Sequence, residues 1–148
     1  MRKGLWLAAS LLVVIALLMG GCVRNSGHPE GMKSLRWLTD DEKDKVIEIA
    51  LSSPKALYYK TGYSRYEVEL QWIGVTWENS EPSSIGIVEY EWMDEATELF
   101  QEEEAVFPGV RIYFGELPEL SLDVAVDLET ETAIDLLALP CTPPTPRR

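Results

Sequence analysis

The sequence predicts an α+β fold, in which an N-terminal helix packs on an antiparallel sheet of about four to five strands. Three observations lead to this prediction. An export signal begins the chain, apolar residues with helical spacing follow it once, and several later stretches alternate apolar with polar residues, as half-buried strands do. A helix followed by a run of strands is typical of α+β domains, in which the helix covers the apolar face of the sheet.

The composition bounds both the size of the fold and the class of partner. The chain has 148 residues, of which 46% are apolar and 26% charged, as in a single globular domain. Its formal net charge of −12 argues against nucleic acid as a partner, because backbone phosphates require basic side chains. The same charge argues against docking on anionic lipid through a basic patch.

The export signal occupies the first residues. Met1-Arg2-Lys3 is a basic start, Gly4 to Met19 carries no charge, and Gly20-Gly21 supplies small residues for a cleavage site. A helix over the apolar run would span roughly 24 Å, which is less than the bilayer core of about 30 Å. A cleaved signal peptide is therefore favoured over a permanent transmembrane helix.

The end of the signal gives a more specific indication. Leu18-Met19-Gly20-Gly21-Cys22 resembles a prokaryotic lipobox, with Met19 at a position where leucine is preferred. The resemblance implies a cleaved lipoprotein signal peptide over residues 1–21 and lipidation of Cys22. It further implies anchoring in the cell membrane or the outer membrane, facing outside the cytoplasm. An uncleaved anchor and ordinary secretion are the alternatives. Val23 stands where an aspartate would signal retention in the inner membrane, so an outer-membrane location is also compatible with the sequence.

The rest of the chain divides into three parts. Residues 22–36 hold the lipidated cysteine and a flexible tether, residues 37–139 one α+β domain, and residues 140–148 a Pro-rich disordered tail. The lone histidine, His28, lies in the tether, where a catalytic role is not expected. Cys141 is a leftover thiol in the tail, and a disulfide to it requires Cys22 to be free of lipid.

The first helix is expected to begin with a capping box, Thr39-Asp40-Asp41-Glu42, whose outer side chains satisfy backbone N–H groups. Its apolar residues share one face: Val46, Ile47, Ala50 and Leu51. Pro54 should end this helix near Ser52, because proline disfavours helical geometry in the residue before it. A short second helix is expected between Ser53 and Gly62, with Ser53 as its cap, Pro54 at its first position and Gly62 beyond its end.

Strand patterns begin at residue 66. Glu67, Glu69 and Gln71 alternate with apolar residues, namely Tyr66, Val68, Leu70 and Trp72. Ile73, Val75 and Trp77 then continue on the opposite parity, which requires either a bulge near Gly74 or burial of both faces of the strand. Residues 78–84 are expected to form a loop because of their composition.

Four further strands are expected over residues 88–92, 110–114, 122–126 and 133–139, with a turn over residues 127–132. The segment 93–105 is ambiguous, although Ala96, Leu99 and Phe100 suit one face of a helix that Pro108-Gly109 would end. The pattern of the first of these strands repeats that of residues 68–72, which suggests two neighbouring strands that present the same faces.

Catalytic motifs are absent from the sequence. No dinucleotide fingerprint, phosphate loop or nucleophile elbow occurs, and one histidine in a tether cannot complete a Ser-His-Asp triad or a tetrahedral zinc site. We therefore expect no enzyme activity, no cofactor and no metal. Paired carboxylates remain the one route to catalysis, but the glutamates of residues 67–69 and 89–91 alternate with core positions, as on a solvated sheet face. Glu102 to Glu104 could attract Ca²⁺, so a cation- or ligand-binding envelope sensor is the alternative function.

Aromatic residues are the candidate binding residues. They lie on the predicted strands and are Trp72, Trp77, Tyr90, Trp92 and Tyr113. Packing within the core or the sheet is the favoured explanation of such residues, since aromatic cross-strand pairs stabilise sheets, and a groove for a peptide or glycan is the alternative. Because they occupy both parities, some of these rings are expected to face solvent and to mark a binding surface. The sequence therefore favours a lipid-anchored, non-enzymatic envelope protein that binds another envelope protein or peptide by its sheet edge or its aromatic face.

Two stretches resemble PepSY-like domains. Residues 38–51 (LTDDEKDKVIEIAL) look like the opening helix of these domains, and residues 124–130 (VAVDLET) are similar to their closing hairpin. Glu131 stands where the family usually has glycine, so the turn must differ or carry strain. The resemblance implies a small non-catalytic module of helix on antiparallel sheet that binds or inhibits peptidases or senses at the envelope. It carries over no active-site residue.

Overall fold

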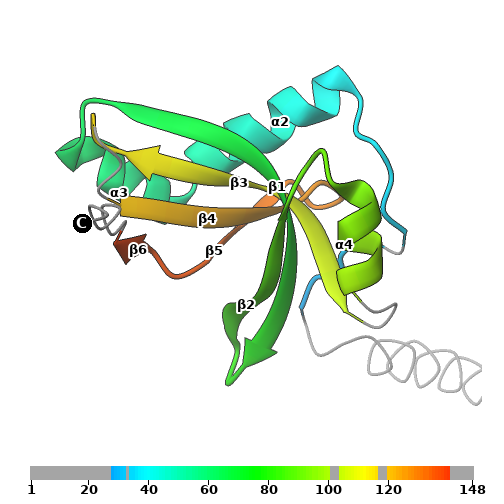
Figure 1. The fold of residues 1–148 in the computed structure, drawn as a ribbon. Helices are drawn as coiled ribbons and strands as arrows, with labels where there is room; N and C mark the ends of the chain where they lie inside the picture. The colour runs from blue at the N-terminus through cyan, green and yellow to red at the C-terminus, as the bar shows by residue number, and fades with distance from the viewer. Residues whose placement is uncertain (1–27, 33, 101–103, 117–119, 141–148) are drawn as a thin grey trace, which may run out of the picture.

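A computed structural model of the chain describes residues 28–32, 34–100, 104–116 and 120–140. The expected signal peptide, Cys22 and residues 141–148 of the expected tail lie outside these ranges. Within them the fold combines helices with a curled antiparallel sheet (Figure 1), which confirms the mixed character predicted from the sequence. No helix in these ranges is both long and apolar enough to cross a bilayer.

Three helices and six strands make up the described ranges, one strand more than expected. The helices are α2 (Asp40–Leu51), α3 (Pro54–Gly62) and α4 (Met93–Leu99). The strands are β1 (Tyr66–Glu78), β2 (Glu81–Glu89), β3 (Ala105–Phe114), β4 (Leu120–Asp127), β5 (Thr132–Asp135) and β6 (Leu139–Pro140). The sheet order is β2-β1-β3-β4-β5, every pair is antiparallel, and the short β6 pairs with β4.

The main core lies between the helices and one face of the sheet. Helix α2 contacts β1, β3, β4 and β5 (Figure 1). The residues of the central strands that face it are Trp72, Val110, Ile112, Phe114, Leu122, Val124 and Val126, all fully buried. Val46 and Ala50 supply the apolar stripe of α2. The predicted packing of the first helix on the sheet is thus confirmed.

The local signals of the first two helices are confirmed. The backbone N–H of Glu42 donates to Thr39 Oγ1 at 3.2 Å, and the Thr39 N–H donates to the Glu42 carboxylate at 2.9 Å. Helix α3 has Ser53 as its cap, and its hydroxyl accepts from the Ala56 N–H at 3.2 Å. The predicted end of the next helix at Pro108-Gly109 is wrong: helix α4 ends at Leu99, and both residues lie within strand β3, which begins at Ala105.

A second apolar cluster lies on the opposite face of the sheet, which we call the open face because α2 does not cover it. This cluster consists of Ile73, Val75, Phe107, Ala125, Ile134 and Leu136. It resolves the parity question in β1. Trp72, Ile73, Gly74 and Val75 are all buried, so both faces of the strand are covered there. A bulge is also present, but the extra residue, Ile85, belongs to β2, while the register of β1 with β3 is unbroken.

The boundaries predicted for the second strand are wrong. Residues 78–84 form a tight hairpin rather than a loop, with Asn79 and Ser80 at φ 51° and 66° and Glu78 paired with Glu81. Two positive φ angles in a two-residue connection are the geometry that matches the twist of paired strands. Strand β2 therefore starts at Glu81 and ends at Glu89, so that Tyr90 and Trp92 lie beyond the strand expected to contain them.

Part of the expected tether lies against the folded body. The Met32 N–H donates to the Val106 carbonyl at 2.8 Å, and His28 stacks on Trp77 with 4.9 Å between ring centroids. Gly31 has φ +76°, and a Cβ at this position would lie 2.7 Å from the Val106 backbone nitrogen. Only glycine combines this φ with such a close approach. The described part of the tether therefore continues the domain along β3.

Candidate functional site: a polar hollow on the open face

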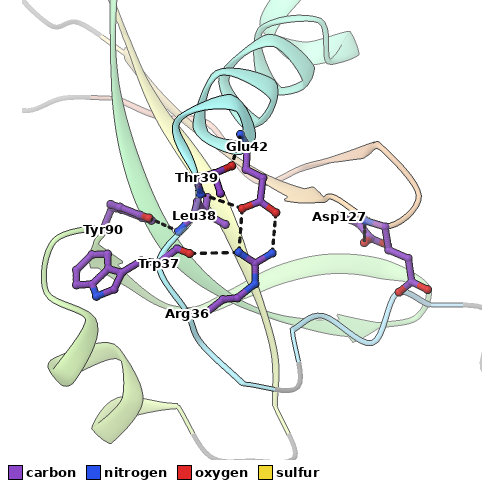
Figure 2. Close-up of polar contacts among 8 residues, drawn as sticks. Arg36, Trp37, Leu38, Thr39, Glu42, Tyr90 and Asp127 are labelled. Atoms are coloured by element: carbon purple, nitrogen blue, oxygen red, sulfur yellow. Dashed lines mark hydrogen bonds and ion pairs between the residues drawn. The ribbon is translucent and has the colours of Figure 1, made fainter.

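The five aromatic candidates do not form one surface. Trp72 and Tyr90 stack on each other at 5.1 Å, and 0% and 7% of their surfaces are exposed. The Trp72 indole N–H donates to the Tyr90 carbonyl at 2.9 Å. Figure 2 shows the second bond of Tyr90, whose hydroxyl accepts from the Leu38 N–H at 2.7 Å. This pair locks the start of α2 to β1 and is part of the core.

Trp77 lies elsewhere, on the apolar end of the open face. It meets Phe107 edge-on at 6.3 Å and carries the stacked ring of His28. Its surface is half-buried. Trp77 therefore contacts both His28 of the described tether residues and the second apolar cluster.

Trp92 and Tyr113 are the two aromatic candidates that the structure brings together. Both line a hollow of about 280 Å³ on the polar end of the open face, which we call the polar hollow. Trp92 comes from the start of α4 and is 51% exposed, and Tyr113 comes from β3. The other polar residues that line it are Glu69 and Gln71 of β1, Glu89 of β2, Glu95 of α4 and Arg111 of β3.

Strand register assembles this polar end. Glu69 pairs with Arg111, which pairs with Asp123, so an alternating polar series from three strands meets on one face. Arg111 donates to both carboxylate oxygens of Asp123, at 2.8 and 3.1 Å, and Asp123 is only 5% exposed. This bidentate hydrogen bonding raises the pKa of the Arg111 guanidinium. The charge of Arg111 is therefore matched within the protein.

The hydroxyl of Tyr113 donates to the Glu69 carboxylate at 3.1 Å. Its partial burial raises the pKa of the Tyr113 phenol, with the bond to Glu69 contributing in the same direction. The phenol is therefore protonated at neutral pH and fixes the orientation of one carboxylate of the polar hollow.

Gln71 is the least exposed polar residue of the polar hollow. Only 3% of its surface is accessible, but among the described residues the only fully buried side-chain polar atom without a hydrogen-bond partner is Asp135 Oδ1, not an atom of the Gln71 amide. A buried amide that lines a hollow is a natural contact for a bound polar group, and sequence analysis missed it because its position looked solvated.

The charge in the polar hollow is negative. Glu69, Glu89 and Glu95 line it, and no cation of the described ranges pairs with them. Carboxylates beside an exposed indole face suit an organic cation, because the ring attracts a guanidinium or ammonium while the carboxylates accept its hydrogen bonds. A hollow of this size holds one side chain rather than a large cofactor.

A larger hollow, of about 500 Å³, lies between the N-terminal segment and the ends of β3 and β4. Two of its charged side chains, those of Arg36 and Asp127, have partners within the protein. Arg36 pairs with Glu42 at 2.6 Å (Figure 2) and holds the pKa of that carboxyl at about 2. Asp127 accepts from the Glu129 N–H at 3.1 Å. In the described ranges, no three His, Cys, Asp or Glu side chains are grouped so as to hold a metal ion. The polar hollow is therefore the candidate site.

The two stretches that resemble PepSY-like domains form α2 and the turn between β4 and β5. Glu131, in the position of the usual glycine, has φ 55° and forms an ion pair with Lys45. The turn thus carries the left-handed conformation that glycine would adopt at lower cost. Searches of family models, of curated proteins and of solved structures each found no match to this chain.

Proposed function

We propose that this chain is a lipid-anchored, non-enzymatic protein of the cell envelope, with Cys22 as the anchor. In this proposal the polar hollow binds a basic segment of another envelope protein or peptide. The lipobox-like end of the apolar N-terminal run supports the anchor. Two or more acyl chains on one residue anchor a protein stably, at about 0.8 kcal/mol per buried CH₂.

The observation that carries the binding proposal is the combination of groups in the polar hollow. Three carboxylates that pair with no cation of the described residues line it, together with the exposed indole of Trp92 and the side chain of Gln71. A lysine or arginine side chain satisfies all three: it pairs with the carboxylates, stacks on the indole and donates to the amide oxygen. The acidic net charge of the chain speeds the encounter with such a partner.

The alternative is an envelope sensor for a cation or small ligand, which would use the same acidic surface. Calcium requires six to eight oxygen ligands, whereas an ammonium or guanidinium group is also stabilised by stacking on an exposed indole. The presence of Trp92 among the carboxylates therefore favours a basic side chain over a metal ion.

The anchor predicts the mass of the mature protein. Purified from its native membrane, the protein should have the mass of residues 22–148 plus acyl groups. Inhibition of signal peptidase II should leave the uncleaved precursor. Intact mass spectrometry distinguishes these species. An uncleaved mass without acyl groups under normal growth would contradict the proposed anchor.

Binding predicts a loss of affinity when the polar hollow loses charge. A tetra-arginine peptide with blocked ends serves as the probe, titrated calorimetrically into the full chain in dodecyl maltoside. The double variant E89Q/E95Q should bind the peptide at least tenfold more weakly than the wild type. Trp92→Ala should also lower the affinity, because each variant removes a contact to the guanidinium.

The matched control is E48Q/E129Q, which removes the same charge from exposed positions outside the polar hollow. It should lower the affinity for the probe less than twofold. Equal losses in the two double variants would show attraction by net charge alone and would contradict a specific site.

A further inference from the structure

We propose that the polar hollow selects arginine over lysine, so that its partner presents a guanidinium group, and that Trp92 determines this choice. This inference rests on the proposed function of the same site and narrows its ligand from any basic side chain to one. Both side chains carry one positive charge, so the acidic field of the chain attracts them equally. Only contacts within the polar hollow can distinguish them.

Trp92 supplies the contact that distinguishes a planar cation from a compact one. Its side chain is 51% exposed and lines the polar hollow. Its backbone N–H donates to the Glu89 carbonyl at 3.0 Å, which holds the residue close to the end of β2. Glu95 follows three residues later in the first turn of α4, where residues at this spacing are neighbours. The exposed indole is therefore positioned beside two of the three carboxylates that line the hollow.

The acceptors of the polar hollow come from different elements. Glu89 of β2 pairs with Gln71 of β1, and Glu69 lies two residues before Gln71 on the same face of β1. Glu69 and Glu89 are therefore diagonal neighbours, with α-carbons roughly 7–8 Å apart. The Tyr113 hydroxyl donates to Glu69 at 3.1 Å and fixes the orientation of that carboxylate. With Glu95 from α4, the acceptors approach a ligand from different sides.

This arrangement suits a planar group better than a compact one. A guanidinium that stacks flat on an indole keeps its five N–H donors in its own plane, directed at acceptors around the edge of the ring. An ammonium over the same ring turns part of its three donors toward the ring, and its small size limits it to acceptors that lie close together. A guanidinium is also more weakly hydrated, so it loses less on entering a hollow of about 280 Å³.

The guanidinium already present in the wall, that of Arg111, does not oppose a second one. Asp123 accepts from Arg111 at both carboxylate oxygens, at 2.8 and 3.1 Å. The charge of Arg111 is therefore matched by a residue that is only 5% exposed. The attraction of the three glutamates for a bound cation is thus retained.

The test compares two peptides of equal charge, tetra-arginine and tetra-lysine with blocked ends, titrated calorimetrically into the full chain in dodecyl maltoside. The wild type should bind tetra-arginine about tenfold more tightly than tetra-lysine. Trp92→Leu keeps an apolar side chain but removes the ring, so it should reduce this ratio below about threefold, mainly by loss of affinity for tetra-arginine. Trp92→Phe keeps a ring and should retain part of the preference.

Trp37→Leu is the matched control, because Trp37 is 56% exposed and lies outside the polar hollow. It should leave the ratio of the two affinities within about twofold of the wild-type value. Tyr113→Phe tests the positioning of Glu69: it should lower the ratio about threefold, the effect of one lost hydrogen bond. A purely structural effect of this substitution would lower both affinities in proportion and would contradict the positioning role.

Equal affinities of the wild type for the two peptides, both lowered by E89Q/E95Q, would overturn the preference for arginine and leave the binding site standing. Tighter binding of tetra-lysine would overturn it as well. An arginine preference that persists unchanged in Trp92→Leu would overturn the role of Trp92. Binding of neither peptide would overturn both the preference and the proposed function.

Discussion

Replacing Trp72 by alanine is expected to lower the free energy of unfolding by about 3–5 kcal/mol, as for other fully buried tryptophans. Its side chain is 0% exposed, stacks on Tyr90 and donates a hydrogen bond to the Tyr90 carbonyl. Truncation would leave a cavity between β1 and the start of α2 and an unpaired carbonyl. A domain of this kind has about 5–15 kcal/mol of stability in total, so the variant should be close to unfolding. Urea unfolding followed by circular dichroism measures the loss.

Trp92→Ala is the matched control, since it removes the same side chain from a position that is 51% exposed. It should lower the free energy of unfolding by less than about 1 kcal/mol, as is usual for exposed positions. It should nevertheless lower the affinity for the tetra-arginine probe. The two substitutions therefore separate folding from binding among residues that sequence analysis grouped together. A larger stability loss for Trp92→Ala than for Trp72→Ala would contradict the assignment of the first to the core.

The first two helices could be predicted because their signals are local, whereas α4, which has no side-chain cap, was left ambiguous. The capping box at Thr39 and Glu42 and the serine cap before Pro54 each act within one turn of chain, so no distant contact is needed to recognise them. Strand β1 could be predicted for a similar reason, since its alternation extends over several residues.

The second strand could not be located, for two physical reasons. Its turn uses Asn79-Ser80 in left-handed conformations rather than the more readily recognised Asn-Gly. Its first half lies at the edge of the sheet, where polar side chains such as Glu81 and Ser83 remain solvated, so it lacks an alternating pattern. The alternating pattern from which this strand was predicted continues to Trp92, but the strand ends at Glu89 and the chain turns after it.

The candidate site was only partly visible in the sequence. Glu69 and Glu89 were expected on a solvated sheet face, and both line the polar hollow. The pairing of Arg111 with Asp123 depends on the register between β3 and β4, which no local pattern specifies. The burial of Gln71 depends on what surrounds β1 on both sides, and only the folded chain shows it.

The open face changes character along its length, from apolar around Ile73 and Phe107 to polar around Arg111. Gly109 pairs with Gln71 at the boundary between the two ends. Its missing side chain leaves the space that Ile73 fills: a Cβ there would lie 2.4 Å from Ile73 Cδ1 and 2.6 Å from the Val124 carbonyl oxygen. Core and candidate site therefore meet at one glycine.

Gly109→Ala is expected to lower the free energy of unfolding by about 3 kcal/mol or more, at the upper end of overpacking costs. The Ile73 side chain can rotate at some cost. The Val124 carbonyl is a backbone group of the paired strand, so β3 and β4 must move apart to make room for the new Cβ. Adding Ile73→Ala should therefore restore no stability. The control is Gly62→Ala at the end of α3, where nothing lies within 4 Å of the new Cβ; it should raise stability by up to about 1 kcal/mol. Equal melting temperatures of Gly109→Ala and Gly62→Ala would contradict the close packing of β3 against β4, and with it the register that brings Arg111 and Asp123 together.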